Sequence, residues 1–203
     1  MHSATLDLSA LRGTFAGRVL QQFHAFAVPP VLVGGSVRDL LLGRELHDLD
    51  LAVPAGALEI ARRLADAMQG AYVPLDAGRD VGRALLNGPH GQLLVVDIAA
   101  WRGPSLADDL AARDFTINAL AAELHGDGAA IIDVTDGLAD LERRLVRTTS
   151  ERALSDDPLR CLRGLRLAAE LSPWGMRLEQ HTAQQNSSSC WAAARKRGRA
   201  GAR

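Results

Sequence analysis

Residues 31–53 read VLVGGSVRDLLLGRELHDLDLAV, and three short patterns follow one another in this segment. The apolar run 31–33 predicts a buried strand that leads directly into two glycines. Residues 36–42 are predicted to form a brief helix, which Gly43 ends. The apolar residues within 49–53 predict a second strand. A strand, a glycine turn, a helix and another strand in this order indicate an α/β fold.

Further elements are predicted on both sides of this segment. Before it, residues 8–26 carry apolar side chains at helical spacing and end before Pro29 and Pro30, which stop a helix. The elements predicted after it are a helix at 55–69, strands at 71–75, 81–86 and 93–99, a helical segment at 105–124 broken near Asp114, strands at 131–134 and 145–148 around a helix at 137–144, and a helix at 155–171. The strands at 81–86 and 93–99 are expected to form a hairpin. The expected fold class is α/β (α+β), with a mixed β-sheet flanked by helices.

The composition excludes several classes of protein. The chain has 203 residues, of which 47% are hydrophobic and 23% charged, and its net charge is −1. A chain of this length can bury a core without disulfides or a structural metal. Its apolar runs are too short for a membrane span, and its first residues do not resemble a signal peptide. Because Cys161 and Cys190 cannot form a secreted-type disulfide framework, the expected location is cytoplasmic.

The end of the chain differs in composition from the rest. Residues 184–189 form a polar run, and residues 191–203 contain five basic and no acidic residues. Such a stretch buries too little apolar surface to order itself, so residues 183–203 are predicted to be a disordered tail. The alternative is a basic tail that binds nucleic acid. Residues 1–190 contain 18 basic and 24 acidic residues, so nucleic-acid binding there needs a local patch.

The glycine pair in the first segment suggests a phosphate site. Gly34 and Gly35 lie between a buried strand and a helix, where the backbone can approach a ligand and free N–H groups can bind phosphate. Arg38, one turn into the helix, can add a charge-assisted contact. The alternative is that the glycines serve only the geometry of the turn.

Three carboxylates in predicted strands suggest a metal site. Asp48 and Asp50 are two residues apart, so a strand directs both carboxylates to one side. Mg²⁺ is commonly bound by one or two carboxylates together with substrate phosphates. Asp97 interrupts an apolar strand and needs a partner, which a metal would supply. Solvent-exposed carboxylates at a turn or a strand end are the alternative. With the glycine turn, the three carboxylates indicate metal-assisted phosphoryl or nucleotidyl transfer.

Two further motifs make the sequence similar to a known family. Residues 110–120, LAARDFTINAL, resemble its arginine–aspartate–phenylalanine–threonine–isoleucine–asparagine motif, and residues 156–166, DDPLRCLRGLR, resemble its nucleotide-selecting helix. Together with residues 31–53, they resemble the head domain of class II tRNA nucleotidyltransferases (CCA-adding enzymes) and bacterial poly(A) polymerases. This family is a branch of the polymerase-β-like nucleotidyltransferases. The resemblance covers about residues 8–182.

The resemblance implies a role for each motif. Asp48 and Asp50 would hold the catalytic Mg²⁺ ions, and Asp97 would help to activate the 3′-hydroxyl of an RNA primer. The residues that would contact the nucleotide or organise its site are Gly34, Gly35, Arg38, Arg113, Asp114 and Asn118.

The helix at 155–171 carries a second set of polar residues. Asp157, Arg160, Arg163 and Arg166 recur every three residues and form a slanted polar stripe. The resemblance implies that Asp157 and Arg160 select the base of the incoming CTP or ATP, with the other two arginines also at the nucleotide. The alternative is an ordinary helix start, with Asp157 as N-cap and Pro158 in the first position.

The expected organisation is a nucleotidyltransferase head at residues 1–150, a truncated helical neck at 151–182 and the non-family tail. The resemblance implies template-independent addition of CMP or AMP to an RNA 3′ end, that of tRNA above all, with Mg²⁺ as cofactor. The alternative is a catalytically silent remnant that binds nucleotide or RNA. CCA addition, CC addition, A addition and poly(A) synthesis share these motifs. No membrane partner is expected, and the oligomeric state is not determined by the sequence.

Overall fold

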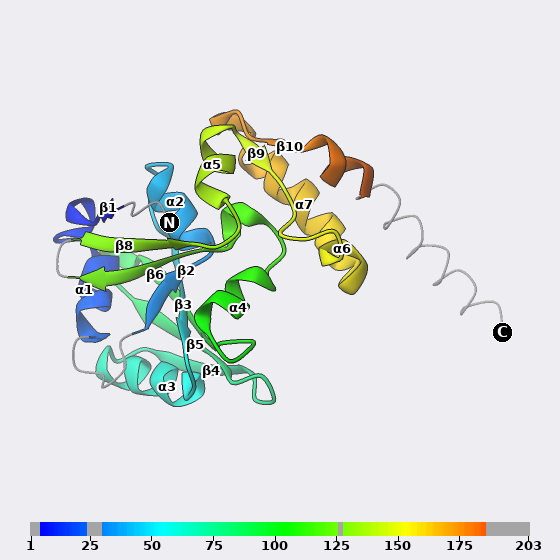
Figure 1. Cartoon of the computed structure of the whole chain (residues 1–203). Coiled ribbons are helices and arrows are strands. Elements are labelled where there is room, and N and C mark those ends of the chain that lie inside the picture. Colours follow the sequence, from blue (N-terminus) through cyan, green and yellow to red (C-terminus); the bar gives the residue numbers. More distant parts are fainter. Residues whose placement is uncertain (1–4, 24–29, 126–127, 186–203) are drawn as a thin grey trace, which may run out of the picture. The chain divides into compact units, whose positions relative to one another are not determined.

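A computed structural model describes residues 5–23, 30–125 and 128–185 (Figure 1). The chain divides into two compact units. Unit 1 comprises Met1–Asp109 and Leu120–Ile132, and unit 2 comprises Leu110–Ala119 and Asp133–Arg203. The predicted boundary between head and neck at residue 150 stays a prediction. Most of the predicted tail lies outside the described residues.

Unit 1 is built on a mixed sheet of eight strands. Their order across the sheet is β1-β8-β7-β2-β3-β6-β5-β4. Strand β1 runs antiparallel to β8, β2 to both β7 and β3, and β5 to both β6 and β4, whereas β3 and β6 run parallel. The strands are β1 (Thr5–Asp7), β2 (Val31–Val33), β3 (Asp48–Val53), β4 (Ala71–Asp76), β5 (Val81–Asn87), β6 (Leu93–Ala100), β7 (Leu120–His125) and β8 (Gly128–Asp133). Together with its helices, this sheet confirms the predicted α/β class.

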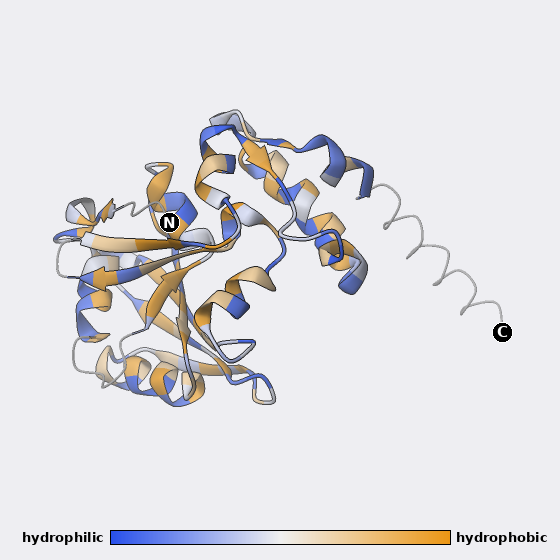
Figure 2. Ribbon diagram, viewed as in Figure 1, coloured by the Kyte–Doolittle hydropathy of each residue, from blue (hydrophilic) through white to orange (hydrophobic). Residues whose placement is uncertain are grey.

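Helix α3 (Ala57–Ala67) packs against β4, β5 and β6. Its polar and apolar sides are visible in Figure 2, and its buried residues are small or aliphatic: Ala57, Ala61, Leu64 and Ala65. The approach to β5 is close at Gly82, where a Cβ atom would lie only 2.8 Å from the Cβ of Ala61. Gly82 therefore faces α3, and Arg83, next to it in the strand, faces the opposite side of the sheet.

The start of α3 is capped by a residue from elsewhere in the chain. The Asp80 carboxylate accepts hydrogen bonds from the backbone N–H groups of Gly56, Ala57 and Leu58 at 2.7, 3.1 and 2.9 Å. The first N–H groups of a helix have no partner inside it, and a negative charge there also stabilises the helix dipole. Asp80 thus joins the β4–β5 loop to α3.

Replacing Asp80 with alanine is expected to lower the free energy of unfolding by about 1–2 kcal/mol, because three N–H groups lose their acceptor. Chemical denaturation of the variant and of Asp76→Ala, at the end of β4 just before this loop, measures the difference. Equal stability of the two variants would contradict the capping role.

Unit 2 is mainly helical. It contains α5 (Gly137–Glu142), α6 (Ala153–Asp156), α7 (Leu159–Glu170) and a parallel pair of short strands, β9 (Leu145–Val146) and β10 (Arg177–Leu178). It also contains two 3-10 helices, η4 (Thr116–Asn118) and η5 (Ser172–Trp174), and residues 180–185 are helical as well. Phe115 is buried against α7 at Gly164, where a Cβ atom would lie 2.8 Å from the phenylalanine ring. No helix in the described ranges is long and apolar enough to cross a membrane.

The predicted helix at 8–26 is wrong in extent. The structure has a 3-10 helix, η1 (Ser9–Leu11), and then α1 (Phe15–Gln22), while residues 24–26 lie outside the described part. Thr14 separates the two, since its hydroxyl donates to the Leu11 carbonyl at 2.8 Å and accepts from Gly17 N–H at 3.0 Å. Threonine in this position is a helix N-cap.

The predicted helical segment at 105–124 is wrong in its second half. Helix α4 (Leu106–Ala111) is followed by η4 and then by β7, which pairs with β2 inside the sheet. Leu120, Ala121 and Ala122 are fully buried there, so pairing in the sheet overrides the helical preference of leucine and alanine. The predicted helix at 155–171 is likewise divided into α6 and α7, because Pro158 lacks the N–H that a continuous helix needs.

Candidate functional site

The predicted catalytic carboxylates share one face of the unit 1 sheet. Asp50 and Asp97 are direct partners in the parallel pair β3 and β6, and Arg83 is the partner of Asp97 in the antiparallel pair β5 and β6. Side chains of paired residues lie on the same side of a sheet. Asp48 lies on that side as well, two residues before Asp50. We call this row of Asp48, Asp50, Asp97 and Arg83 the carboxylate face.

The glycine turn lies next to Asp50. Helix α2 (Gly35–Leu41) begins directly after Gly34, whose φ of 66° and ψ of −132° are open in practice only to glycine. A Cβ atom on Gly35 would lie 3.4 Å both from Asp50 Oδ2 and from Arg38 Nη2. A carboxylate and a guanidinium therefore border the bare backbone of Gly35, which is the arrangement expected for a phosphate near a metal ion.

Arg38 is buried and is held by its neighbour in the chain. Its Nε and Nη2 donate to the two oxygens of Asp39 at 2.9 and 3.1 Å. Asp39 also accepts from Arg44 Nη1 at 2.8 Å, so one carboxylate joins two guanidinium groups. The group has a net positive charge, which suits an anionic ligand at the turn.

Ser36, which was not among the predicted site residues, links the glycine turn to β3. This buried hydroxyl accepts a hydrogen bond from Asp50 N–H at 2.8 Å and donates one to the Asp48 carbonyl at 3.4 Å. Ser36 thereby fixes the backbone that carries both carboxylates. No periodicity marks a serine for this role, because its partners are 12 and 14 residues away in sequence.

The partner that Asp97 needs is supplied by the chain itself. Arg83 Nε and Nη2 donate to Asp97 Oδ1 and Oδ2 at 2.6 and 2.8 Å. The hydrogen bond to Asp97 raises the pKa of the Arg83 guanidinium above its ordinary value, and the charges of Asp97, Asp50 and Asp48 add to this effect against the cost of burial. Arg83 was not among the predicted site residues, although a single arginine in an apolar strand was a signal for it.

The residues of the carboxylate face fit a magnesium ion. Asp48 and Asp50 offer oxygen donors from one strand, and Mg²⁺ is commonly held by one or two carboxylates together with substrate phosphates. Because Gly35 has no side chain, the backbone there is bare between the Asp50 carboxylate and the Arg38 guanidinium. Among the described residues, no three histidine, cysteine or acidic side chains form a complete cation cluster. The assignment of Mg²⁺ to Asp48 and Asp50 stays a prediction.

A second group of predicted residues surrounds Phe115 in unit 2. Asp114 is buried, accepts from Phe115 N–H at 2.9 Å and pairs with Arg163 Nε at 2.8 Å. Arg113 Nη1 donates to the carbonyl of Asn118 at 3.4 Å. Arg113, Asp114, Asn118 and Arg163 are thus neighbours.

The Asp157 helix shows the contacts of an ordinary helix start. Asp157 Oδ1 accepts from Leu159 N–H at 3.0 Å, as an N-cap does. Arg160 is half-buried, and its two Nη atoms donate to the carbonyls of Ala153 at 3.3 Å and Ala112 at 3.1 Å. Arg166 is exposed. The role of these residues in base selection stays a prediction.

The predicted residues therefore fall into two groups, one in each unit. Unit 1 holds Gly34, Gly35, Arg38, Asp48, Asp50 and Asp97, and unit 2 holds Arg113, Asp114, Asn118, Asp157, Arg160, Arg163 and Arg166.

Known proteins resemble both groups of motifs. The sequence model of the poly A polymerase head domain matches residues 31–103 and 89–147. A CC-adding tRNA nucleotidyltransferase of Synechocystis sp. is 42% identical over 153 residues, which are 73% of this chain and 35% of that protein. A CCA-adding enzyme of Lactiplantibacillus plantarum is 33% identical over 180 residues, 82% of this chain and 41% of that protein.

Solved structures resemble most of the chain. A CCA-adding enzyme in complex with ATP has a TM-score of 0.77 at 30% identity and covers 97% of this chain. The Thermotoga maritima CCA-adding enzyme in complex with tRNA has a TM-score of 0.73 at 31% identity and covers 93% of it. The chain spans 48% and 46% of these two proteins, and a little more than a third of the curated relatives. The matches confirm the resemblance drawn from the motifs: the chain belongs to the family of class II CCA-adding enzymes and bacterial poly(A) polymerases.

Proposed function

We propose that this chain carries the nucleotidyltransferase centre of an enzyme that adds CMP or AMP, from CTP or ATP, to an RNA 3′ end without a template. The observation that carries the proposal is the meeting of Asp50 and Arg38 at the bare backbone of Gly35. This arrangement offers a carboxylate for a cation and a guanidinium for phosphates within one small space.

Each candidate site residue of unit 1 has a separate role in the proposed reaction. Gly35 and Arg38 bind the triphosphate of the nucleotide, and Asp48 and Asp50 would hold the Mg²⁺ ions of a two-metal mechanism. When bound, Mg²⁺ stabilises the negative charge that develops on the phosphates. Asp97, oriented by Arg83, helps to activate the primer hydroxyl. The 3′-oxygen passes its proton to Asp97 or to water and forms a bond to the α-phosphorus, while the bond from the α-phosphorus to the pyrophosphate oxygen breaks and pyrophosphate leaves.

The residues of unit 2 support base selection in this proposal. Asp157 carries an acceptor and Arg160 carries donors one helical turn away, so the pair can match the edge of cytosine or adenine. Arg160 also fastens α7 to the Ala112 carbonyl, beside Arg113. In this proposal, Arg160 therefore both contributes to base selection and holds α7 against the residues next to Arg113.

Replacing Arg160 with alanine is expected to weaken CTP and ATP binding and to relax discrimination against UTP and GTP by about 1–3 kcal/mol, because one set of base-edge donors is lost. Equilibrium binding of the four nucleotides measures both quantities. Arg152→Ala, at an exposed position before α6, is the control. If the affinity for all four nucleotides falls equally, Arg160 contacts phosphate or has a structural role, and it does not select the base.

The RNA substrate that we propose is the 3′ end of tRNA. CC-adding and CCA-adding enzymes both occur among the relatives, at 34–42% and 33–38% identity respectively. Incubating the protein with tRNA transcripts that lack the last three nucleotides, and with labelled CTP or ATP, tests the reaction. Incorporation of cytidine alone would indicate CC addition, and cytidine followed by adenosine CCA addition. The proposed location is the cytoplasm, on the basis of the cysteine content.

The alternative, a catalytically silent protein that binds nucleotide or RNA, stays a prediction, and it gives a different experimental result. Nucleotide binding that is lost in Arg38→Ala, together with no transfer to any RNA, would favour it over the enzyme. Neither binding nor transfer would overturn the proposed function.

A further inference from the structure

Arg83 places a positive charge beside the three carboxylates of the carboxylate face. Its guanidinium meets Asp97 through two parallel hydrogen bonds of 2.6 and 2.8 Å, the strongest geometry that an arginine and a carboxylate form. Both side chains are about one-third exposed, so water only partly screens the pair. The orientation of the Asp97 carboxylate is thereby set by a residue from the neighbouring strand.

The charge of Arg83 also acts on the other two carboxylates. Asp97 is the direct neighbour of Asp50 across β3 and β6, and strands lie about 4.8 Å apart. Arg83 is therefore two strands from Asp50, on the same side of the sheet. The charges of Asp50 and Asp48 both stabilise the protonated guanidinium. By reciprocity, Arg83 opposes any second cation that approaches Asp48 and Asp50.

We propose that Arg83 is a positioning residue that orients Asp97 and lowers the affinity of Asp48 and Asp50 for a divalent cation in the absence of nucleotide. The inference rests on the proposed metal site. Its consequence is that the cation binds well only when the phosphates of a nucleotide add their own charge and oxygen ligands at Gly35 and Arg38. An arginine that merely supports the sheet would change stability and leave cation affinity as it is.

The experiment measures Mn²⁺ binding to the whole chain without nucleotide, by electron paramagnetic resonance of the free ion. Arg83→Met removes the charge and keeps much of the aliphatic side chain, and it is expected to bind Mn²⁺ about 3–10 times more tightly than the wild type. Arg83→Lys keeps the charge and loses the two-pronged contact, so its affinity is expected to stay within about twofold. Incorporation at saturating Mn²⁺ is expected to fall about tenfold or more in Arg83→Met, because Asp97 loses its orientation.

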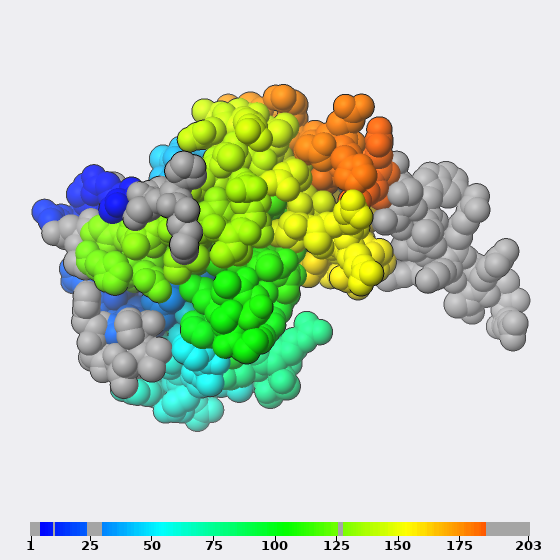
Figure 3. All heavy atoms as spheres, in the orientation of Figure 1, coloured from blue at the N-terminus to red at the C-terminus, as the bar shows by residue number. Residues whose placement is uncertain are grey.

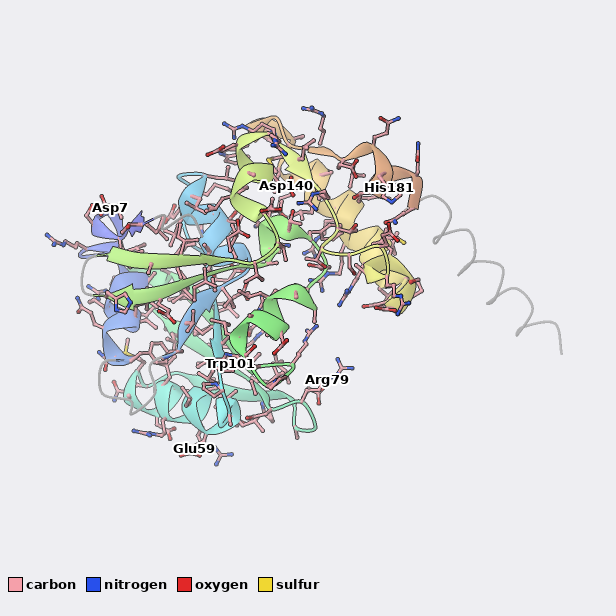
Figure 4. All side chains as sticks on the ribbon, in the orientation of Figure 1. Asp7, Glu59, Arg79, Trp101, Asp140 and His181 are labelled. Carbon is pink, nitrogen blue, oxygen red and sulfur yellow. The ribbon has the colours of Figure 1, made fainter. Side chains whose placement is uncertain are left out.

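Arg79→Met is the matched control. Arg79 lies in the loop between β4 and β5, which projects from unit 1 in Figures 1 and 3, and its side chain is 78% exposed (labelled in Figure 4). The substitution removes the same charge from the same hairpin and is expected to leave Mn²⁺ affinity within about twofold. A tighter binding in both variants would reveal a general effect of net charge and overturn the proposal.

Two further outcomes separate this inference from the function on which it rests. Mn²⁺ binding that Asp48→Asn abolishes and Arg83→Met leaves unchanged overturns the role of Arg83 alone. A wild type without any Mn²⁺ binding that depends on Asp48 overturns the metal site and the role of Arg83 together. If Arg83→Met does not fold, Arg83→Gln takes its place, since the amide still donates to Asp97 without a charge, and the same comparison decides.

Discussion

Asp50→Asn is expected to lower the rate of nucleotide incorporation at least about 1,000-fold while the protein stays folded. The Asp50 carboxylate borders Gly35 and lies beside Asp97, so it is the central oxygen donor of the carboxylate face. Asparagine keeps the shape of the side chain and removes its charge, and a neutral amide is a poor ligand for Mg²⁺. A loss of this size corresponds to about 4 kcal/mol of transition-state stabilisation.

The measurement is incorporation of labelled CTP into an RNA primer at saturating Mg²⁺, with Asp48→Asn as the companion variant. Asp66→Asn, on the exposed side of α3, is the matched control and is expected to keep normal activity. The unfolding midpoints of all three variants should remain within a few degrees of the wild type. Near-normal incorporation by Asp50→Asn or by Asp48→Asn would contradict the metal assignment.

Asp140→Ala is expected to destabilise unit 2 by about 2–4 kcal/mol, because the buried Thr116 hydroxyl loses an acceptor and the one-third-exposed Arg147 loses its counter-charge. The Asp140 carboxylate is 2% exposed (labelled in Figure 4), accepts from Thr116 Oγ1 at 2.6 Å and pairs with Arg147 Nε at 2.8 Å. It therefore connects α5 to η4 and to the residue after β9. Thr116 belongs to the same motif as Arg113, so nucleotide binding is expected to weaken along with stability.

Thermal and chemical unfolding of the variant measure the loss, which for a chain of this size corresponds to a midpoint lowered by roughly 4–15 °C. Asp140→Asn, which retains acceptor oxygens, should lose less. Glu142→Ala, at an exposed position on the same helix, should change the free energy of unfolding by less than about 0.5 kcal/mol. If Asp140→Ala and Glu142→Ala unfold at the same temperature, the buried network does not hold unit 2 together.

Local sequence patterns were sufficient for much of the fold and for the identity of the candidate residues. The apolar runs at 31–33 and 49–53 form β2 and β3, and the hairpin predicted near residue 90 forms β5 and β6. Such strands are recognisable because their burial leaves a short apolar run bounded by turn residues. The glycine pair, the two acidic residues of β3 and the motif at 110–120 also sufficed for the family, which the comparisons confirm.

These local patterns could not predict contacts between residues that are distant in the sequence. Residues 120–125 have the composition of a helix, and only their place beside β2 in the middle of the sheet makes them a strand. Ser36 and Asp140 form hydrogen bonds with residues of other helices and strands. No periodic pattern in the sequence therefore predicts their contacts.

The sequence by itself determined the α/β class and, through its resemblance to the family, the nucleotidyltransferase head and its candidate acidic residues, because strand alternation, glycine turns and short motifs are local properties. Only the tertiary structure decided that Asp97 is paired with Arg83. The hairpin was predictable, but its register was not, and a slip of one residue would turn Arg83 to the α3 side of the sheet. The register is set by the hydrogen bonds between β5 and β6 and by the close packing of Gly82 on α3, both of which exist only in the folded chain.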